Sequence, residues 1–406
     1  MFVFLLKTKA QMEQLLRKSR HKVQNTPHEF KRYLYHQINL KNRQISIVGG
    51  RGTGKTTLLL QIAVKLKDIM SLYVALDDLF FTNTTLYHLA EDFEKHGGKL
   101  LLLDEVHKYP GWSRELKLIY DDFPELQVIF SSSSILDIYK GEADLSRRTI
   151  SYILKELSFR EYMKFYEKIN LPQISLQTLL NEHENISRDL IQRIKPLKYF
   201  MSYIKYGAYP FYNGNENEYY QQIKNIINLI LEVDLPAVKS LEYSNIAKLK
   251  RLLYVLSVNV PFTPNISKLS EKIGLSRNAI IQALQLLDKA ELIHILYKQT
   301  RSISALSKPD KIWLNNSNLS YALSSGEPDK GSLRESFFIS QVNFLHDISL
   351  AEKGDFIVDN NYVFEIGGKN KTTKQIKGMK NAFIVKDNIE TGVFNSIPLW
   401  LFGLLY

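Results

Sequence analysis

Residues 49–56 read Gly49-Gly50-Arg51-Gly52-Thr53-Gly54-Lys55-Thr56. This order fits the pattern Gly-x-x-x-x-Gly-Lys-Ser/Thr at every position. The apolar stretch QISIV precedes it and the helix-period stretch TTLLLQIAVKL follows, which is the strand–loop–helix context that the pattern needs. Glycines let such a loop wrap closely around a ligand, and its peptide N–H groups then point into one concavity at the positive end of a helix dipole. The stretch therefore predicts a phosphate-binding loop.

Two residues of this loop are expected to make the most specific contacts. The Lys55 ammonium is expected to reach the β- and γ-phosphates of a nucleotide, which makes it a catalytic as well as a binding residue, and the Thr56 hydroxyl is expected to ligate Mg²⁺. ATP and Mg²⁺ are therefore the predicted cofactors. An ordinary glycine-rich turn is the weaker alternative, because both the match and its context are complete. The other predicted nucleotide-binding residues are Gly49, Gly50, Arg51, Gly52, Thr53, Gly54 and Thr57.

Short apolar runs alternate with helix-period stretches through the first 160 residues. The runs are rich in Leu, Ile and Val and end in polar or small residues, which is typical of buried strands. They lie at 44–50, 71–78, 99–106, 126–133 and 151–157. This alternation predicts an α/β fold with a parallel sheet that helices cover on both faces.

The third apolar run ends in two carboxylates, Asp104 and Glu105. Adjacent residues of a strand point to opposite faces, so one acid can face a metal and the other the γ-phosphate. We expect Asp104 to hold Mg²⁺ together with Thr56, and Glu105 to polarise the attacking water.

Further catalytic candidates follow the next strand. Ser131 opens a run of four serines and could hydrogen-bond the γ-phosphate or the attacking water, or belong to a loop that caps the following helix. Arg147 or its neighbour Arg148 could stabilise transition-state charge, in the same chain or from a neighbouring subunit. A solvated basic pair is an equal alternative.

Near residue 265 the pattern of a compact helix–turn–helix appears. Its helix-period stretches lie at 246–258, 265–274 and 276–290. Ser276 is a good N-cap for the third helix, and two strand candidates follow as a wing whose loop holds Arg301 and Lys308. The third helix is expected to expose residue types that can read base edges in a DNA groove: Arg277, Asn278, Gln282 and Gln285. Packing of this winged helix on a neighbouring domain is an equally open alternative.

The C-terminal part contains Glu335, Asp355, Glu365 and Lys369 in an order that resembles PD-(D/E)xK nucleases. Such enzymes need two carboxylates for Mg²⁺ and a lysine near the scissile phosphate. The usual spacing is Glu-x-Lys, but Gly367 stands where that lysine belongs. Lys369 has the right parity only if the strand continues past Gly367, and glycines favour an early strand end. A degenerate or binding-only nuclease-like fold is therefore preferred over an active nuclease.

Composition limits the protein class. The chain has 406 residues, a net charge of +11 and no cysteine. The absence of cysteine excludes disulfide scaffolds, thiolate zinc sites and cysteine nucleophiles and suits a reducing compartment. The positive charge, with the Lys-rich run 369–380, permits a polyanion such as DNA as a partner. No apolar run reaches the ~18 residues of a membrane span, and MFVFLLK lacks the basic start of a signal peptide. We therefore expect a cytoplasmic protein with no membrane partner.

Several stretches occur in one order: VGGRGTGKTTLL, LLLLDEVHKYPGW, the serine run and DLSRRTISYILKELSFREYM. Together they resemble prokaryotic AAA-type ATP-binding proteins, in which a winged helix and a restriction-endonuclease-like domain of unknown function follow the P-loop domain. The resemblance implies a P-loop NTPase sheet of the additional-strand type, with strand order 5-1-4-3-2, and ATP hydrolysis. The expected domains are the ATPase with a basic N-terminal lead-in at 1–160, the helical and winged-helix region at 161–325 and a small α/β endonuclease-like domain at 326–406.

Three functions remain open from the sequence. The leading interpretation is an ATP hydrolase whose nucleotide state moves the C-terminal region, alone, with a protein partner or as a homo-oligomer. The second is a nucleotide-gated DNA-binding protein or nuclease, and the third a switch that binds ATP without hydrolysis. Glu105 argues against the third, because a binding-only site has no need of a water-polarising acid.

Overall fold

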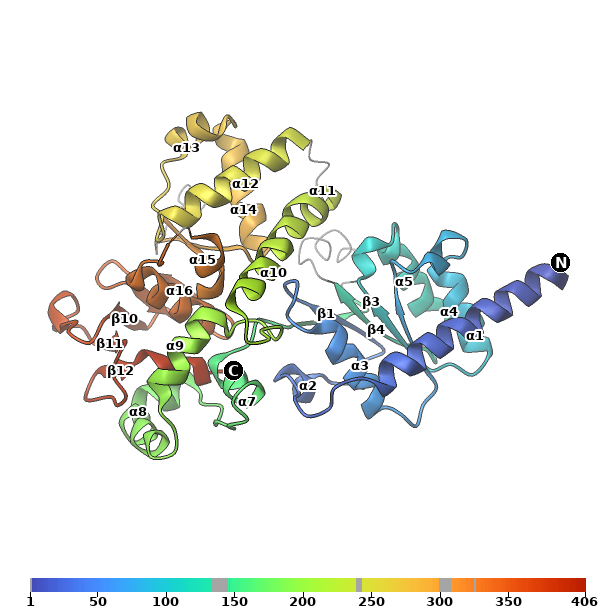
Figure 1. Ribbon diagram of the computed structural model, residues 1–406, viewed down its shortest axis with the longest axis horizontal. Helices are drawn as coiled ribbons and strands as arrows, with labels where there is room; N and C mark the ends of the chain where they lie inside the picture. Colours follow the sequence, from blue (N-terminus) through green and yellow to red (C-terminus); the bar gives the residue numbers. More distant parts are fainter. Residues whose placement is uncertain (1, 133–144, 146, 239–242, 299–307, 325) are drawn as a thin grey trace. The chain divides into compact units, whose positions relative to one another are not determined.

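The computed structural model describes residues 2–132, 145, 147–238, 243–298, 308–324 and 326–406 (Figure 1). The chain divides into two compact units, Met1–Lys155 and Glu156–Tyr406.

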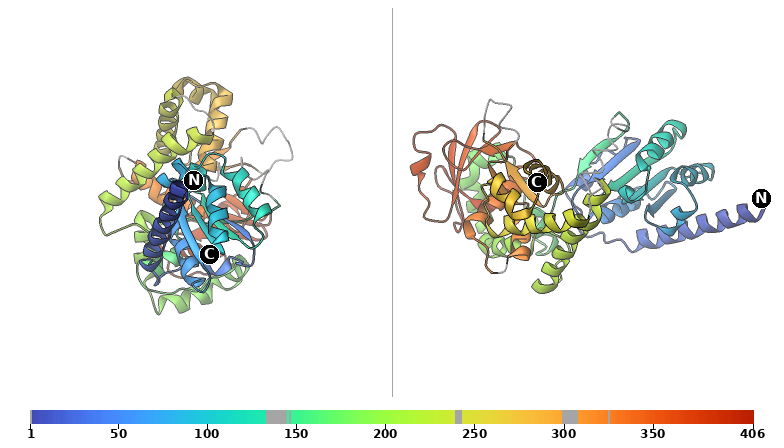
Figure 2. Two further views of the ribbon diagram at one scale, coloured as in Figure 1. Left: turned by 90° about the vertical axis from the view of Figure 1, so that its right-hand side faces the viewer. Right: turned by 90° about the horizontal axis from the view of Figure 1, so that it is seen from above.

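A five-stranded parallel sheet forms the centre of the first unit. Its strands are β1 (Gln44–Val48), β2 (Ser71–Ala75), β3 (Leu100–Asp104), β4 (Gln127–Ser132) and β5 (Ile150–Ile153). Their order is β2-β3-β4-β1-β5, which confirms the predicted order 5-1-4-3-2 and the P-loop NTPase fold class. Strands β1 and β3 are buried along their whole length because helices cover both faces of the sheet (Figures 1 and 2).

The described helices of this unit are α1 (Phe2–Gln24), α2 (Leu34–Gln37), α3 (Lys55–Lys65), η1 (Leu79–Thr82), α4 (Leu86–Lys95), η2 (Val106–Lys108) and α5 (Trp112–Asp122). Helices α1 and α2 precede β1, and the other described helices lie between the strands in sequence, as the alternation predicts. Helix α4 begins where the Thr85 hydroxyl accepts a hydrogen bond from the His88 N–H. Helices α4 and α5 pack together, and their apolar faces share one core with Leu101 and Leu103 of β3.

The second unit begins with helices, as predicted from the change of pattern near residue 160. They are α7 (Phe159–Phe165), α8 (Leu176–Ile191), α9 (Pro196–Tyr206), α10 (Glu216–Leu229), η3 (Ile230–Asp234), α11 (Leu235–Val238), α12 (Tyr243–Val258), α13 (Ile266–Ile273) and α14 (Arg277–Lys289). The Ser276 hydroxyl caps α14 by accepting a hydrogen bond from the Ala279 N–H, as predicted. Strands β6 (Ile293–Leu296) and β7 (Lys311–Leu314) form an antiparallel pair after α14.

A second five-stranded sheet completes this unit. The elements are α15 (Ser317–Leu323), α16 (Lys330–Val342), β8 (Ile348–Leu350), β9 (Phe356–Val358), β10 (Tyr362–Gly367), η5 (Thr373–Gln375), β11 (Ala382–Lys386), β12 (Ser396–Pro398) and η6 (Leu399–Leu404). The strand order is β12-β11-β10-β9-β8, with β8, β9 and β10 antiparallel and β10, β11 and β12 parallel. The three-residue strands β8 and β12 were not expected, because such short runs show no clear periodicity.

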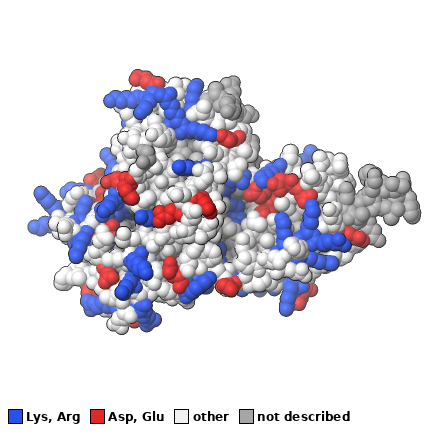
Figure 3. Space-filling model, in the orientation of Figure 1, with Lys and Arg blue, Asp and Glu red and all other residues white. Residues whose placement is uncertain are grey.

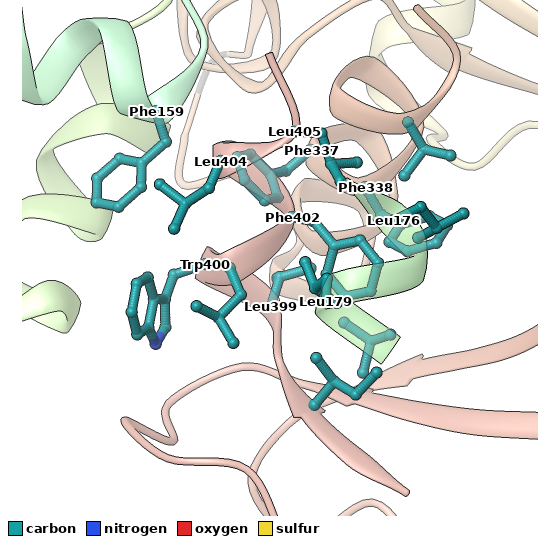
Figure 4. Packing of buried hydrophobic residues seen from close by; sticks show 14 of the residues in the cluster. Phe159, Leu176, Leu179, Phe337, Phe338, Leu399, Trp400, Phe402, Leu404 and Leu405 are labelled. Atoms are coloured by element: carbon teal, nitrogen blue, oxygen red, sulfur yellow. The ribbon is translucent and has the colours of Figure 1, made fainter. Parts of the chain in front are cut away.

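One apolar core joins both ends of the second unit. Phe159 of α7, Leu176 of α8, Phe337 of α16 and Trp400 of η6 belong to the same cluster (Figure 4). The C-terminal apolar stretch, residues 397–406, is therefore buried in this core. The predicted boundary near residue 325 stays a prediction. Within the described ranges, no helix combines the length and the apolar composition that crossing a membrane requires.

Candidate functional site

The predicted phosphate loop lies between β1 and α3, at the carboxyl end of the strand. Gly54 has a left-handed backbone with φ of 98°, and helix α3 begins directly after it. A Cβ on Gly49 would lie 2.1 Å from the Leu154 carbonyl oxygen, so only glycine fits where the loop passes the end of β5. Both glycines of the motif are thus required by the local backbone.

The side chain of Lys55 points back into the loop of residues 49–54. Its side chain is buried, and its Nζ donates to the carbonyl oxygens of Gly49 at 2.8 Å and Gly50 at 2.7 Å. Thr53 is also buried, and its hydroxyl donates to the Gly50 carbonyl at 2.9 Å. The loop therefore closes around the Lys55 ammonium. Thr56 and Thr57 at the start of α3 are exposed.

Arg32 supports the loop from the outside and was missed by sequence reasoning. Its buried guanidinium donates to the Thr53 carbonyl and, at 2.6 Å, to the Lys155 carbonyl. The next residue, Tyr33, donates its hydroxyl to the Ile153 carbonyl at 2.6 Å. This pair joins the loop to the last residues of the first unit. Nothing in the local sequence could have signalled this.

Three hydroxyl groups converge on the Asp104 carboxylate at the end of β3. Thr56 and Tyr73 both donate to its Oδ2, each at 2.7 Å, and Ser131 donates to its Oδ1. The structure thus brings together three of the predicted site residues, Thr56, Asp104 and Ser131, and adds Tyr73 of β2. Burial and the Asp104 charge raise the pKa of Tyr73, so its phenol stays protonated and can donate.

Glu105 lies just past the end of β3 in a left-handed conformation with φ of 54°. Its carboxylate is 2.8 Å from Lys108 Nζ and 3.7 Å from the Arg51 guanidinium, and Lys108 also pairs with Asp77 at 2.6 Å. Burial alone would raise the pKa of Glu105, but the hydrogen bond from Lys108 and the charge of Arg51 outweigh it and lower that pKa. Glu105 is therefore ionised at neutral pH. Its backbone N–H donates to Ser131 Oγ at 3.1 Å, so Ser131 contacts both acids.

The predicted arginines, Arg147 and Arg148, lie just before β5. Arg148 pairs with Asp121 of α5 at 2.9 Å. Arg147 is exposed and makes no hydrogen bond or ion pair with any described residue. Ser133 and Ser134, the last two residues of the serine run, fall outside the described residues.

The C-terminal carboxylates come from α16, from β10 and from the residue just before β9. Glu335 of α16 accepts a hydrogen bond from Trp313 Nε1 at 2.8 Å, and Asp355 accepts one from the Ile366 N–H at 2.7 Å. Glu365 of β10 is fully buried and forms an ion pair with Lys371. Lys369 is exposed beyond the strand end, so Lys371 is the lysine that contacts the cluster.

The charges of these groups interact. Burial raises the pKa of Glu335 to about 7, and the Asp355 charge adds to the effect. Burial and Asp355 also raise the pKa of Glu365, although Lys371 partly offsets them. In the part of the chain that the structure describes, no three His, Asp or Glu side chains are grouped as a metal site would require. The cluster therefore differs from a ready-made metal centre.

The raised pKa of Glu335 predicts a pH dependence of stability. The folded state binds this proton more tightly than the unfolded state, whose pKa is near 4.5, so the free energy of unfolding should fall as pH rises from 4.5 to about 7. The difference between these two pKa values corresponds to a change in the free energy of unfolding on the order of 3 kcal/mol at most. Glu335→Gln should make this fall smaller by the Glu335 contribution, because the amide oxygen can still accept from Trp313 but cannot ionise; the raised pKa of Glu365 keeps a part of it.

The measurement is urea unfolding followed by tryptophan fluorescence across this pH range, since two of the three tryptophans, Trp313 and Trp400, lie in the second unit. Glu352→Gln, at an exposed glutamate, is the matched control and should keep the slope. An equal slope in wild type and Glu335→Gln would contradict the prediction.

The helix–turn–helix segment places its predicted polar residues on the surface. Arg277, Asn278, Gln282 and Gln285 of α14 are all exposed, while Ile280, Leu284 and Leu287 are buried. Lys308 is exposed, and Arg301 falls outside the described residues.

Comparisons with known proteins agree with this architecture in its first part. Residues 41–163 match the family described as "AAA domain", and residues 197–330 match the family described as "Domain of unknown function (DUF8612)". An uncharacterized protein of Methanocaldococcus jannaschii is 25% identical over 289 residues, which cover 68% of this chain. The alignment spans 61% of that relative's length.

Two solved structures are also similar. The Walker-type ATPase of Pyrococcus abyssi aligns with 11% identity and a TM-score of 0.42, covering 72% of this chain and 95% of that one. DnaA of Aquifex aeolicus bound to AMPPCP aligns with 16% identity and a TM-score of 0.26, covering 68% of this chain and 88% of that one. The family match over residues 41–163, together with the sheet order and the loop, supports an AAA-type domain with a P-loop NTPase core in the N-terminal part of the chain.

Proposed function

We propose that this chain binds Mg-ATP at loop 49–56 and hydrolyses it. The observation that supports this best is the 2.7 Å hydrogen bond between Thr56 Oγ1 and Asp104 Oδ2, directly beside the loop that holds Lys55. A hydroxyl and a carboxylate side by side are oxygen ligands of the kind that Mg²⁺ prefers, so Thr56 and Asp104 would hold the ion, which would supply positive charge against the phosphates. The residues present therefore fit both cofactors.

Glu105 is proposed as the group that polarises the attacking water. Its carboxylate is ionised because Lys108 and Arg51 stabilise the charge, so it can accept a proton or orient a water without first losing one. Ser131 contacts Asp104 and the backbone of Glu105 and would hold the two acids in a fixed relation. Arg147 in this chain, or from a neighbouring subunit, remains the proposed source of additional positive charge.

Phosphate release from ATP, measured with Mg²⁺ and again after chelation with EDTA, tests this function. We expect steady release that depends on Mg²⁺ and saturates with ATP. ATP binding by calorimetry without any phosphate release would favour a non-hydrolysing switch. If ATP is neither bound nor hydrolysed, the proposal is refuted.

We also propose that nucleotide state reaches the second unit through Arg32. This side chain ties the Thr53 carbonyl of the loop to the Lys155 carbonyl, and Lys155 directly precedes the first residue of the second unit. Gly49 also abuts the Leu154 carbonyl. A change in loop conformation on nucleotide binding would therefore shift the chain segment from which the second unit extends.

Arg32→Lys is expected to uncouple the two units. Lysine has a single ammonium on a flexible stem, whereas Arg32 uses two separate nitrogens of a planar guanidinium, so lysine cannot hold these two carbonyls in the same fixed geometry. ATP should still bind, but ATP-dependent changes in hydrogen exchange within residues 156–406 should be lost. Arg43→Lys is the matched control, because Arg43 also bridges two carbonyls of the first unit, those of Tyr120 and Phe123, away from the loop. Retention of the exchange changes in Arg32→Lys would refute the coupling.

A further inference from the structure

Helix α14 turns a polar face without acids toward solvent. Exposed side chains recur along it at a spacing of four, three and four residues, which places them on one side of a helix. They are Asn278, Gln282, Gln285 and Lys289, with Arg277 beside the first. The opposite side packs into the unit through Ile280, Ala283, Leu284 and Leu287, all buried. The polar face is thus a rigidly supported surface.

The surroundings of this face are strongly positive. Residues 243–298 and 308–314 hold ten Lys and Arg against four Asp and Glu. Three of the acids are engaged inside the segment: Glu291 is buried, Asp288 accepts a hydrogen bond from the Ile295 N–H and Asp310 accepts one from the Lys298 N–H. Glu271 is the exposed one among the described residues. Figure 3 shows Lys and Arg over the part of the second unit that α12, α13 and α14 form.

A cleft of about 560 Å³ lies beside the start of α14. Thr263, Asn265, Arg277, Asn278 and Lys308 line it together with apolar side chains. Neither Arg277 nor Lys308 forms an ion pair with a described residue, so both cations are available to a ligand. The cleft therefore adds two unneutralised charges at the edge of the polar face.

We propose that this surface binds duplex DNA, with the α14 amides toward base edges and with Arg277 and Lys308 on backbone phosphates. An α-helix fits the major groove of DNA, and amide side chains carry the donor and acceptor that base edges can pair with. Lys and Arg supply the phosphate contacts that position such a helix. An acidic peptide would match the charge but would leave the row of amides without a defined partner. The proposal goes beyond ATP hydrolysis and does not depend on it.

The proposed phosphate contacts are tested by fluorescence anisotropy of the full chain with a labelled duplex of mixed sequence at several salt concentrations. Affinity should fall linearly on a log–log plot against salt. Arg277→Gln with Lys308→Gln should weaken binding and reduce the slope by about 1.8, or about 0.9 for each phosphate contact. The control is Lys195→Gln with Lys224→Gln, two exposed lysines of the same unit that form no hydrogen bond or ion pair with a described residue, and it should behave as wild type.

The base-reading part is tested by selecting preferred sequences from a randomised duplex pool. The wild-type chain should enrich particular sequences, and Asn278→Ala with Gln285→Ala should bind these no better than the mixed duplex. Thermal unfolding checks that the variants, all at exposed positions, remain folded. The proposal is overturned by absent duplex binding at low salt, by tighter binding of single-stranded RNA of equal length, or by a slope unchanged in the double charge variant. If the variant with Asn278→Ala and Gln285→Ala still prefers the selected sequences, α14 reads no bases.

Discussion

Replacing Glu105 by Gln is expected to lower ATP turnover by on the order of 100-fold or more, the scale of a positioned acid–base group. Glutamine keeps the shape of the side chain but has no negative charge with which to polarise water. ATP affinity should stay close to that of the wild type, because Lys55, Thr56 and Asp104 are unchanged. Phosphate release and calorimetry measure the two quantities separately.

The matched control for this variant is Glu125→Gln, at a glutamate of the same unit whose side chain is 73% exposed and 3.6 Å from Lys99. It loses one carboxylate as well but should keep full turnover. Lys108 retains Asp77 as a partner in Glu105→Gln, so the local fold has a reason to persist. Turnover within a few-fold of the wild type would show that Glu105 has been assigned the wrong role.

The nucleotide site could be predicted from sequence only where its residues lie in local motifs. The loop, Thr56 and the acids after β3 belong to contiguous patterns, and their meeting follows from the parallel order of strands. Tyr73 could not be found in this way. It reaches Asp104 because the register of β2 on β3 sets Ala75 opposite Asp104, which leaves Tyr73 on the same face two residues earlier. Strand register is a tertiary property that no local pattern fixes.

In the C-terminal carboxylate cluster, too, the local sequence did not determine which residues come into contact. Lys369 was the predicted lysine because it follows Glu365 with even spacing, but β10 ends at Gly367. The chain then turns back, with the Lys371 N–H donating to the Gly368 carbonyl at 2.9 Å. A Cβ on Gly367 would lie 2.6 Å from the Lys371 side chain. The glycine that appeared to interrupt the motif therefore makes room for the lysine that pairs with Glu365.

Lys55→Ala is expected to weaken ATP binding by at least about ten-fold, which corresponds to ~1.4 kcal/mol. The Lys55 ammonium is buried in the loop and held by the Gly49 and Gly50 carbonyls, so it is positioned before any phosphate arrives. Its removal takes a charge-assisted contact from the β- and γ-phosphates. Calorimetric titration with ATP measures the loss. Lys67→Ala, at an exposed lysine just beyond α3, removes the same charge from the same unit and should leave binding unchanged.

The variant also removes two hydrogen bonds within the loop, so a loosened loop could weaken binding without any direct role for the charge. Titration with AMP separates the two causes, because AMP lacks the phosphates that Lys55 is proposed to contact. A lost charge should weaken ATP binding far more than AMP binding, whereas a distorted loop should weaken both alike. Equal losses for the two nucleotides would therefore reduce Lys55 to a residue that shapes the loop, and unchanged ATP affinity would show that the phosphate site has been misassigned.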